Sequence, residues 1–202
     1  MLLAIDTSAG TGVAIVDRDA GVLASRESAD TRGHAEVIGT FIAECLLEAG
    51  VSAGQLSAVV AGVGPGPFTG LRVGIAAARV FALGAGKPAL AVASHDALAF
   101  GRSEPTLVVT DARRREVYWS LYGAPDGDGL PVRLEGPALS KPDELETPEG
   151  FVRFEPATVS AASLGLLAEA MFVHGRPFAG PEALYLRSPD VTLSAGPKRV
   201  SS

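Results

Sequence analysis

The chain has 202 residues and a formal net charge of −6, from 17 lysines and arginines against 23 aspartates and glutamates. This balance argues against a protein that grips nucleic-acid phosphates over a broad surface, because such binding needs a large excess of positive charge. The single cysteine, Cys45, excludes an internal disulfide and a cysteine-cluster zinc site. Hydrophobic residues make up 47% of the chain, so we expect apolar surface that one monomer leaves uncovered.

The first half begins with three short apolar runs separated by turn-forming residues. They predict an antiparallel meander over residues 2–6, 12–17 and 21–28. An amphipathic helix is predicted next, from His34 to Ala49, with Gly50 as its cap. The apolar segment 56–63 predicts a central strand, because neither of its faces favours water. A Gly-Pro-Gly-Pro loop then leads into a second helix, from Phe68 to about Leu83.

The later elements are predicted in the same way. Strands are expected at 88–93, 106–111, 116–122, 130–135 and 151–154, and helices at 94–100, with Ser94 as N-cap, and at 161–174. The longest apolar stretch, 73–91, contains Arg79 and Lys87, so it is too broken to span a membrane. The amino-terminal apolar run ends too early for a secretory signal, and we therefore expect a cytoplasmic protein.

The second helix carries a ridge of small residues, because Gly70, Gly74, Ala78 and Ala82 recur every four positions. A glycine inside a helix costs about 1 kcal/mol relative to alanine, which indicates that something approaches the backbone closely. We expect this ridge and the apolar stripe of the first helix to pair with two equivalent helices of a partner; burial inside the monomer is the alternative. The expected contact residues are Ile38, Phe41, Ile42, Cys45, Phe68, Thr69, Gly70, Arg72, Val73, Gly74, Ala77 and Ala78.

Four polar residues are candidates to face a phosphate: Asp6, Thr7, Ser8 and Asp111. The first three follow a strand and precede a glycine-bearing hairpin, whose backbone amides can bind phosphate oxygens. Asp111 ends the corresponding strand of the second half. The alternative is that Asp6 hydrogen-bonds its own turn.

Catalytic and metal-binding patterns are missing from the sequence. No histidine has a second one within helical reach, and one turn after His34 stands Ile38, so we expect no metal site. The hydroxyl residues lack a paired base, so no catalytic residue is expected. The run Arg113-Arg114-Arg115 has three interpretations: a contact with RNA, a contact with a partner's carboxylates, or a solvated turn.

Several segments together resemble the TsaB (YeaZ) family, and the resemblance covers most of the chain. They are Leu3–Ser8, Gly64–Gly74, Asp111–Arg113 and Glu116–Trp119, supported by Arg32–His34 and Leu184–Arg187. The resemblance implies an α/β, actin-like (ASKHA, ribonuclease-H-like) fold with two lobes. Residues 1–100 would form an amino-terminal lobe with the partner-binding helices, and residues 101–202 a smaller carboxy-terminal lobe.

The resemblance also implies a function. Such a protein is a non-catalytic scaffold for threonylcarbamoyl transfer to the adenosine next to the anticodon of tRNA. It binds and activates the catalytic paralogue TsaD and helps to recruit the ATPase subunit TsaE. The expected cofactors are none of its own, with ATP or ADP at the surface shared with the partner. We further expect a homodimer when the chain is alone and tRNA contact mainly through the complex.

A rival interpretation is an actin-like small-molecule kinase or ATPase, with Asp6 and Asp111 serving magnesium and phosphate. One departure from the family pattern weighs against it. After residues 151–154 the chain passes almost directly to the helix near Ala161, where the family has a longer loop. A segment is therefore expected to be absent or short there, which argues against nucleotide binding by this chain alone.

Overall fold

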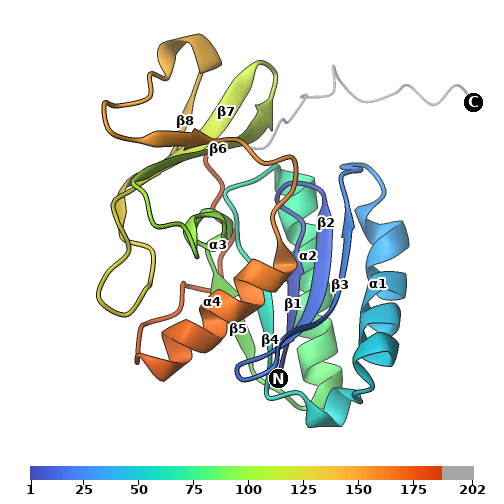
Figure 1. Cartoon of the computed structure of the whole chain (residues 1–202). Coiled ribbons are helices and arrows are strands. Elements are labelled where there is room, and N and C mark those ends of the chain that lie inside the picture. The colour runs from blue at the N-terminus through green and yellow to red at the C-terminus, as the bar shows by residue number, and fades with distance from the viewer. Residues whose placement is uncertain (188–202) are drawn as a thin grey trace, which may run out of the picture.

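The structure, a computed structural model, describes residues 1–187, which form two lobes (Figure 1). The end of the predicted carboxy-terminal lobe, residues 188–202, lies outside the described residues. In chain order the elements are β1 (Leu2–Asp6), β2 (Thr11–Asp17), β3 (Gly21–Ser28), α1 (His34–Ala49), η1 (Ala53–Gln55), β4 (Ala58–Gly62), α2 (Phe68–Ala85), β5 (Ala89–Val92), α3 (Ser94–Ala99), β6 (Thr106–Arg113), β7 (Glu116–Tyr122), β8 (Arg133–Ser140), η2 (Pro142–Glu144), β9 (Val152–Phe154) and α4 (Ala161–Val173).

The first sheet has the strand order β3-β2-β1-β4-β5, with β1 antiparallel to β2 and parallel to β4. Alternate residues of β1 point to opposite faces. Leu3 and Ile5 pack with α1 and α2, whereas Leu2 and Ala4 pack with α4. Helices therefore cover both faces of this sheet (Figure 1), which explains why its central strands are apolar throughout.

The second sheet has the order β8-β7-β6-β9, in which β9 alone runs parallel to its neighbour. Helix α3 contacts β6 and β7, and it also contacts α4. After β9 the chain returns to the first sheet, because α4 packs against β1 and β2 (Figure 1). The lobe boundary near residue 100 stays a prediction, but the last helix among the described residues, α4, is attached to the first sheet.

Two local predictions are wrong. The strand expected at 130–135 begins at Arg133 and runs to Ser140, because Asp126 holds the preceding residues in a turn by accepting the backbone N–H of Leu130 at 3.0 Å. Ser94 is not the N-cap of α3, which follows Ala93 and has no side-chain cap. The Ser94 hydroxyl donates instead to Asp6.

Helix α2 is the one described helix that is long and apolar enough, by length and composition alone, to cross a membrane. Its inner face is part of the protein core, since Leu71, Ala78 and Ala82 are buried against the first sheet. Burial of this face in the core therefore explains part of the high hydropathy of α2.

Candidate functional site

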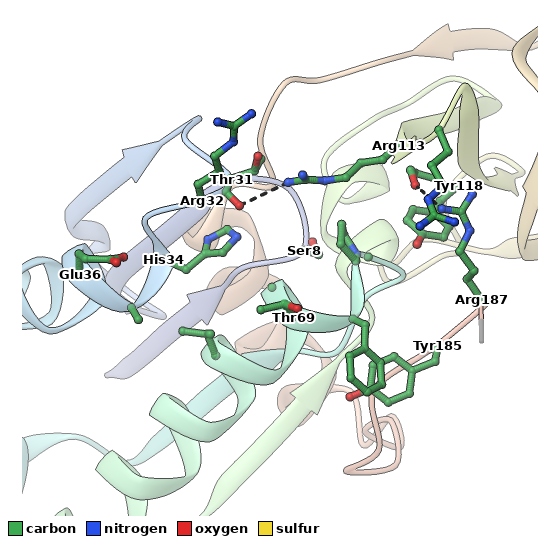
Figure 2. Close-up of a pocket in the computed structure, with 18 residues that line it drawn as sticks. Ser8, Thr31, Arg32, His34, Glu36, Thr69, Arg113, Tyr118, Tyr185 and Arg187 are labelled. Carbon is green, nitrogen blue, oxygen red and sulfur yellow. Dashed lines mark hydrogen bonds between the residues drawn. The ribbon is translucent and has the colours of Figure 1, made fainter. Parts of the chain in front are cut away.

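A cavity of about 600 Å³ lies where the two lobes meet. The loop after β1, the loop before α1 and the start of α2 line it from the first lobe (Figure 2). The β6–β7 hairpin and the segment around Tyr185 and Arg187 line the other side. Five separate stretches of the chain therefore converge on one opening.

The cavity lining is strongly basic. Among the described residues, it contains Arg32, Arg113, Arg114 and Arg187, against the single carboxylate of Glu36. Figure 2 shows Arg113 reaching across the opening, where its Nη2 donates to the carbonyl oxygen of Thr31 at 3.3 Å. This excess of positive charge is local, because the whole chain carries −6.

The hairpin between β6 and β7 has an unusual backbone. Arg113, Arg114 and Arg115 have φ angles of 62°, 55° and 63°, all in the left-handed region. Arg113 pairs with Glu116, so Arg114 and Arg115 form a two-residue loop. Positive φ at both loop residues is typical of a type I′ turn, for which Asn-Gly is the favoured sequence. Non-glycine residues in this conformation cost about 1 kcal/mol or more each, and all three side chains are exposed.

His34 begins α1 beside the same cavity, with only 7% of its surface exposed. Its Nδ1 lies 2.7 Å from the hydroxyl oxygen of Thr11, while its Nε2 faces Gly70. Burial, and then the charge of Arg113, lower the pKa of His34, which favours a neutral ring. The described part of the chain contains no cluster of three or more side chains suited to holding a metal ion.

Asp6 does not face the cavity, so its assignment as a phosphate-facing residue is wrong. Only 1% of it is exposed, and it accepts hydrogen bonds from the backbone and hydroxyl of Ser8, at 2.7 and 2.6 Å, and from Ser94 at 2.5 Å. A side chain on Gly62 would collide with this carboxyl group. Burial raises the pKa of Asp6 above its ordinary value.

The other three phosphate candidates, Thr7, Ser8 and Asp111, have different surroundings. Thr7 is buried and donates to the carbonyl oxygen of Gly70 at 2.7 Å, so its assignment is also wrong. Ser8 lines the cavity, but its hydroxyl donates to Asp6. Asp111 is exposed and accepts the backbone N–H of Arg113 at 2.8 Å. The kinase interpretation requires the carboxylates of Asp6 and Asp111 to face one site. Asp6 is instead buried against β4, so the two carboxylates do not meet there.

The small-residue ridge of α2 faces its own sheet. The Thr7 hydroxyl oxygen accepts a hydrogen bond from the backbone N–H of Gly74 at 2.9 Å. A side chain on Gly70 or Gly74 would collide with Thr7. The assignment of the ridge to a partner contact is therefore wrong, and the monomer alternative is correct. The same correction applies to these buried members of the predicted contact: Ile38, Ile42, Cys45, Gly70, Gly74 and Ala78.

Cys45 illustrates the correction on α1. It is fully buried in the core beneath the first sheet. Its Sγ lies 3.5 Å from the carbonyl oxygen of Val13, to which the thiol donates. Burial raises the pKa of the thiol to about 11, so Cys45 is a core residue rather than a nucleophile.

The remaining predicted contact residues lie nearer the surface. Phe68 packs on Tyr185 with 4.8 Å between ring centroids, and the Arg72 guanidinium lies 3.6 Å from the centre of the Phe68 ring. Thr69 is exposed at the cavity mouth. Phe41, Val73 and Ala77 are half-buried.

The outward faces of α1 and α2 carry apolar residues that the sequence prediction missed. Leu47 is 84% exposed, Val80 69% and Leu83 82%. Both helices begin at the cavity and run away from it on the same face of the first sheet (Figure 1). Small residues lie exposed beside the large ones: Ala35, Gly39 and Ala43 on α1, and Ala76 and Gly84 on α2.

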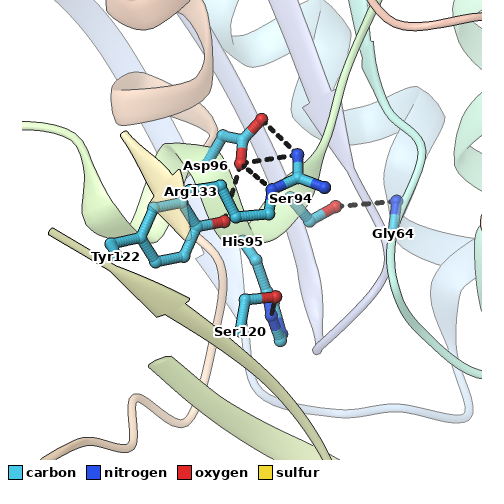
Figure 3. Close-up of polar contacts among 7 residues, drawn as sticks. All are labelled: Gly64, Ser94, His95, Asp96, Ser120, Tyr122 and Arg133. Atoms are coloured by element: carbon cyan, nitrogen blue, oxygen red, sulfur yellow. Dashed lines mark hydrogen bonds and ion pairs between the residues drawn. The ribbon is translucent and has the colours of Figure 1, made fainter. Parts of the chain in front are cut away.

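His95 connects α3 to the second sheet. It is 1% exposed, with Nδ1 at 2.8 Å from the Ser120 hydroxyl and Nε2 at 2.9 Å from the Thr110 hydroxyl. Burial lowers its pKa to about 3. Next to it, Asp96 accepts hydrogen bonds from Tyr122 at 2.6 Å and from Arg133 at 2.7 Å (Figure 3).

The sequence of this chain is similar to a family model and to several known proteins. The model of the family described as "TsaD: tRNA N6-adenosine threonylcarbamoyltransferase" matches residues 21–152. An uncharacterised protein of Mycobacterium tuberculosis is 38% identical over 205 residues, which span 94% of this chain and 92% of the relative. The Escherichia coli "tRNA threonylcarbamoyladenosine biosynthesis protein TsaB" is 34% identical over 147 residues, 70% of this chain. That alignment covers 63% of the E. coli protein, and the alignment with a longer Mycobacterium leprae relative covers 55% of it.

Solved structures show the same likeness over nearly the whole chain. The structure titled "YeaZ from Pseudomonas aeruginosa" superposes with a TM-score of 0.76 at 25% identity, covering 92% of this chain and 99% of the other. This match, together with the two sheets described above, confirms the predicted α/β, actin-like fold.

Proposed function

Because the chain belongs to the TsaB (YeaZ) family, we propose that it is the non-catalytic scaffold subunit for threonylcarbamoyl transfer to the adenosine next to the anticodon of tRNA. In this proposal it acts in the cytoplasm, where it binds and activates the catalytic paralogue TsaD and helps to recruit TsaE. Proteins of this family are named as tRNA threonylcarbamoyladenosine biosynthesis proteins.

The exposed apolar face of α1 and α2 is the observation that carries the proposal. Leu47, Val80 and Leu83 are all more than two-thirds exposed on one side of the molecule. Burying a leucine or valine side chain contributes about 1.5–3 kcal/mol, so leaving three of them in water is costly. Grouped exposed apolar residues are typical of an interaction surface.

The small residues on the same face suit a helical partner. A side chain added at Gly39 or Gly84 would meet nothing within 4 Å, so another helix backbone can approach closely there. A paralogue of the same fold would offer two equivalent helices, and the two pairs would meet about an approximate two-fold axis. This four-helix contact replaces the one predicted through the buried ridge.

The residues of the first lobe also support a scaffold rather than an enzyme. Both oxygens of the Asp6 carboxylate accept hydrogen bonds, from Ser8 and from Ser94. Ile38, one turn after His34, lies in the core. We therefore assign the chemistry to the partner.

A calorimetric titration with TsaD from the same organism tests the proposal. The double variant Val80→Glu/Leu83→Glu should bind TsaD at least 100-fold more weakly, because two carboxylates would be buried without partners. The matched control is Phe172→Glu, which changes an apolar residue that is 73% exposed on α4, across the sheet. Unchanged affinity in the double variant, or an equal loss in the control, would contradict the proposed face.

A further inference from the structure

We propose that Arg72 and Arg79 of α2 bind carboxylates of TsaD, in a groove beside the exposed apolar face of α1 and α2. The inference rests on the proposed function, because it names the chemistry that TsaD brings to the same interface. It adds a charged contact, which determines specificity, to the apolar one.

The groove has a volume of about 500 Å³ and lies between α2 and residues 179–187. Arg72 and Arg79 line it from the helix. On the other side the chain is fixed by its backbone, because the N–H of Leu184 donates to the carbonyl oxygen of Val63 at 2.8 Å. The groove is therefore already formed in the free subunit.

Contacts within the chain orient both guanidinium groups. That of Arg72 lies 3.6 Å from the centre of the Phe68 ring, and its Nε donates to the Tyr185 hydroxyl at 3.1 Å. The Nη2 of Arg79 donates to the carbonyl oxygen of Pro181. A guanidinium that is already oriented loses little freedom when its other N–H groups bind a carboxylate.

The charge of the groove is not balanced by neighbouring carboxylates. Within residues 1–187 neither arginine forms an ion pair, although Glu182 lines the same groove. Helix α2 contains no acidic residue. On the adjacent α1, Glu44 and Glu48 already form ion pairs with Arg26. A partner is therefore needed to supply the negative charge.

The arginines lie on the face of α2 that the proposed function gives to the partner. Arg79 stands three positions after Ala76 and four before Leu83, so these residues share one helical face, and all three are exposed. A partner that covers Leu83 also covers Arg79. Burying a charge without a counter-charge is strongly destabilising, whereas a carboxylate can accept two parallel hydrogen bonds from a guanidinium. We therefore expect TsaD to present carboxylates at this position.

Two other occupants fit the groove less well. A second copy of this chain can cover the apolar face, but it brings the same two arginines and an α2 without carboxylates. A nucleic acid suits a polar surface, whereas this groove borders Val80 and Leu83, which are 69% and 82% exposed.

The first test is a calorimetric titration of the full chain with TsaD at 50 and 300 mM KCl. Arg72→Gln/Arg79→Gln should bind about 30-fold more weakly at the lower salt concentration, because carboxylates of TsaD lose their partners. Its affinity should also depend less on salt than that of the wild type, since a screened attraction is removed. The matched control is Arg18→Gln/Lys141→Gln, which removes two exposed cations outside the groove and should bind like the wild type.

The second test identifies the contact and keeps the positive charge. Arg72→Lys/Arg79→Lys places amines in the groove, and a carbodiimide joins an amine to a carboxylate that touches it. Mass spectrometry of the treated complex should find an aspartate or glutamate of TsaD joined to position 72 or 79. If the glutamine variant does not fold, this cross-link alone decides the inference.

Unchanged affinity and salt dependence in the glutamine variant, or an equal loss in the control, overturns the inference. So does the absence of a cross-link to TsaD, including a cross-link to a second copy alone. Loss of tRNA binding with TsaD binding intact would assign the arginines to phosphates and also overturn it. In each of these cases the wild type still binds TsaD, so the proposed function stands. If the wild-type chain does not bind TsaD, the proposed function fails and this inference fails with it.

Discussion

At the scale of single residues, the contact between Thr7 and Gly74 determines how closely α2 packs on the first sheet. The Thr7 hydroxyl donates to the carbonyl oxygen of Gly70 and accepts the N–H of Gly74. Both glycines are needed because a side chain at either position would occupy the space of Thr7. The conformational cost of two helical glycines is thus offset inside one chain, without a partner.

We predict that Gly74→Ala destabilises the protein by about 1–5 kcal/mol. Overpacking costs about 1–3 kcal/mol, and disturbing the buried hydrogen bond to Thr7 adds about 1–3 kcal/mol, while helix propensity returns about 1 kcal/mol. Urea unfolding measures the difference. Gly84→Ala in the same helix is the control: its new side chain would meet no atom within 4 Å, so it should be neutral or stabilise by up to about 1 kcal/mol. A stable Gly74→Ala protein that had lost partner binding would instead restore the ridge as an interface.

At the scale of elements, the sequence predicted most strands and helices within a few residues, because their apolar periods and glycine ends are clear. It did not predict which face of a helix turns outward. Small residues lie on both faces of α2, with Gly74 and Ala78 inside and Ala76 and Gly84 outside. Periodicity alone cannot separate them, since a small residue fits equally well against a sheet or at an exposed contact. The partner of Gly74, the Thr7 side chain, lies far away in the sequence.

The outward faces of α1 and α2 lead to a prediction about the chain alone. Without TsaD, the same apolar residues are available to a second copy, and we expect a homodimer with two-fold symmetry. Leu47→Lys/Leu83→Lys should be monomeric by light scattering at a concentration where the wild type is dimeric, because lysines brought together there repel and lose water. Phe172→Lys on the opposite side should remain dimeric. A monomeric wild-type chain, or a dimeric double variant, would contradict the use of this face.

At the scale of the whole molecule, the two lobes are joined through α3 and across the cavity mouth. The sequence predicted a lobed α/β protein through its family resemblance. It could not predict the junction, because His95 finds its partners on β6 and β7 only after both sheets have formed. The sequence also could not predict the cavity lining, because Arg32 and Arg113 lie 81 positions apart in the chain and come together only in the folded protein.

The His95 junction predicts how the stability of the protein depends on pH. Burial lowers the folded pKa of His95 to about 3, from an ordinary value of 6.5. Between these values the unfolded chain binds a proton that the folded chain does not, so stability falls as the pH is lowered below 6.5. The expected loss from this residue is about 2 kcal/mol between pH 7.5 and pH 5.

Urea unfolding at the two pH values, for the wild type and for His95→Gln, measures this contribution. Glutamine can still hydrogen-bond Ser120 or Thr110 but does not titrate, so the variant should lose less stability on acidification, by about 2 kcal/mol. A smaller dependence should remain, because the pKa of His34 is lowered in the same direction. Identical pH dependence in wild type and His95→Gln would mean that the junction opens and admits a proton before the molecule unfolds.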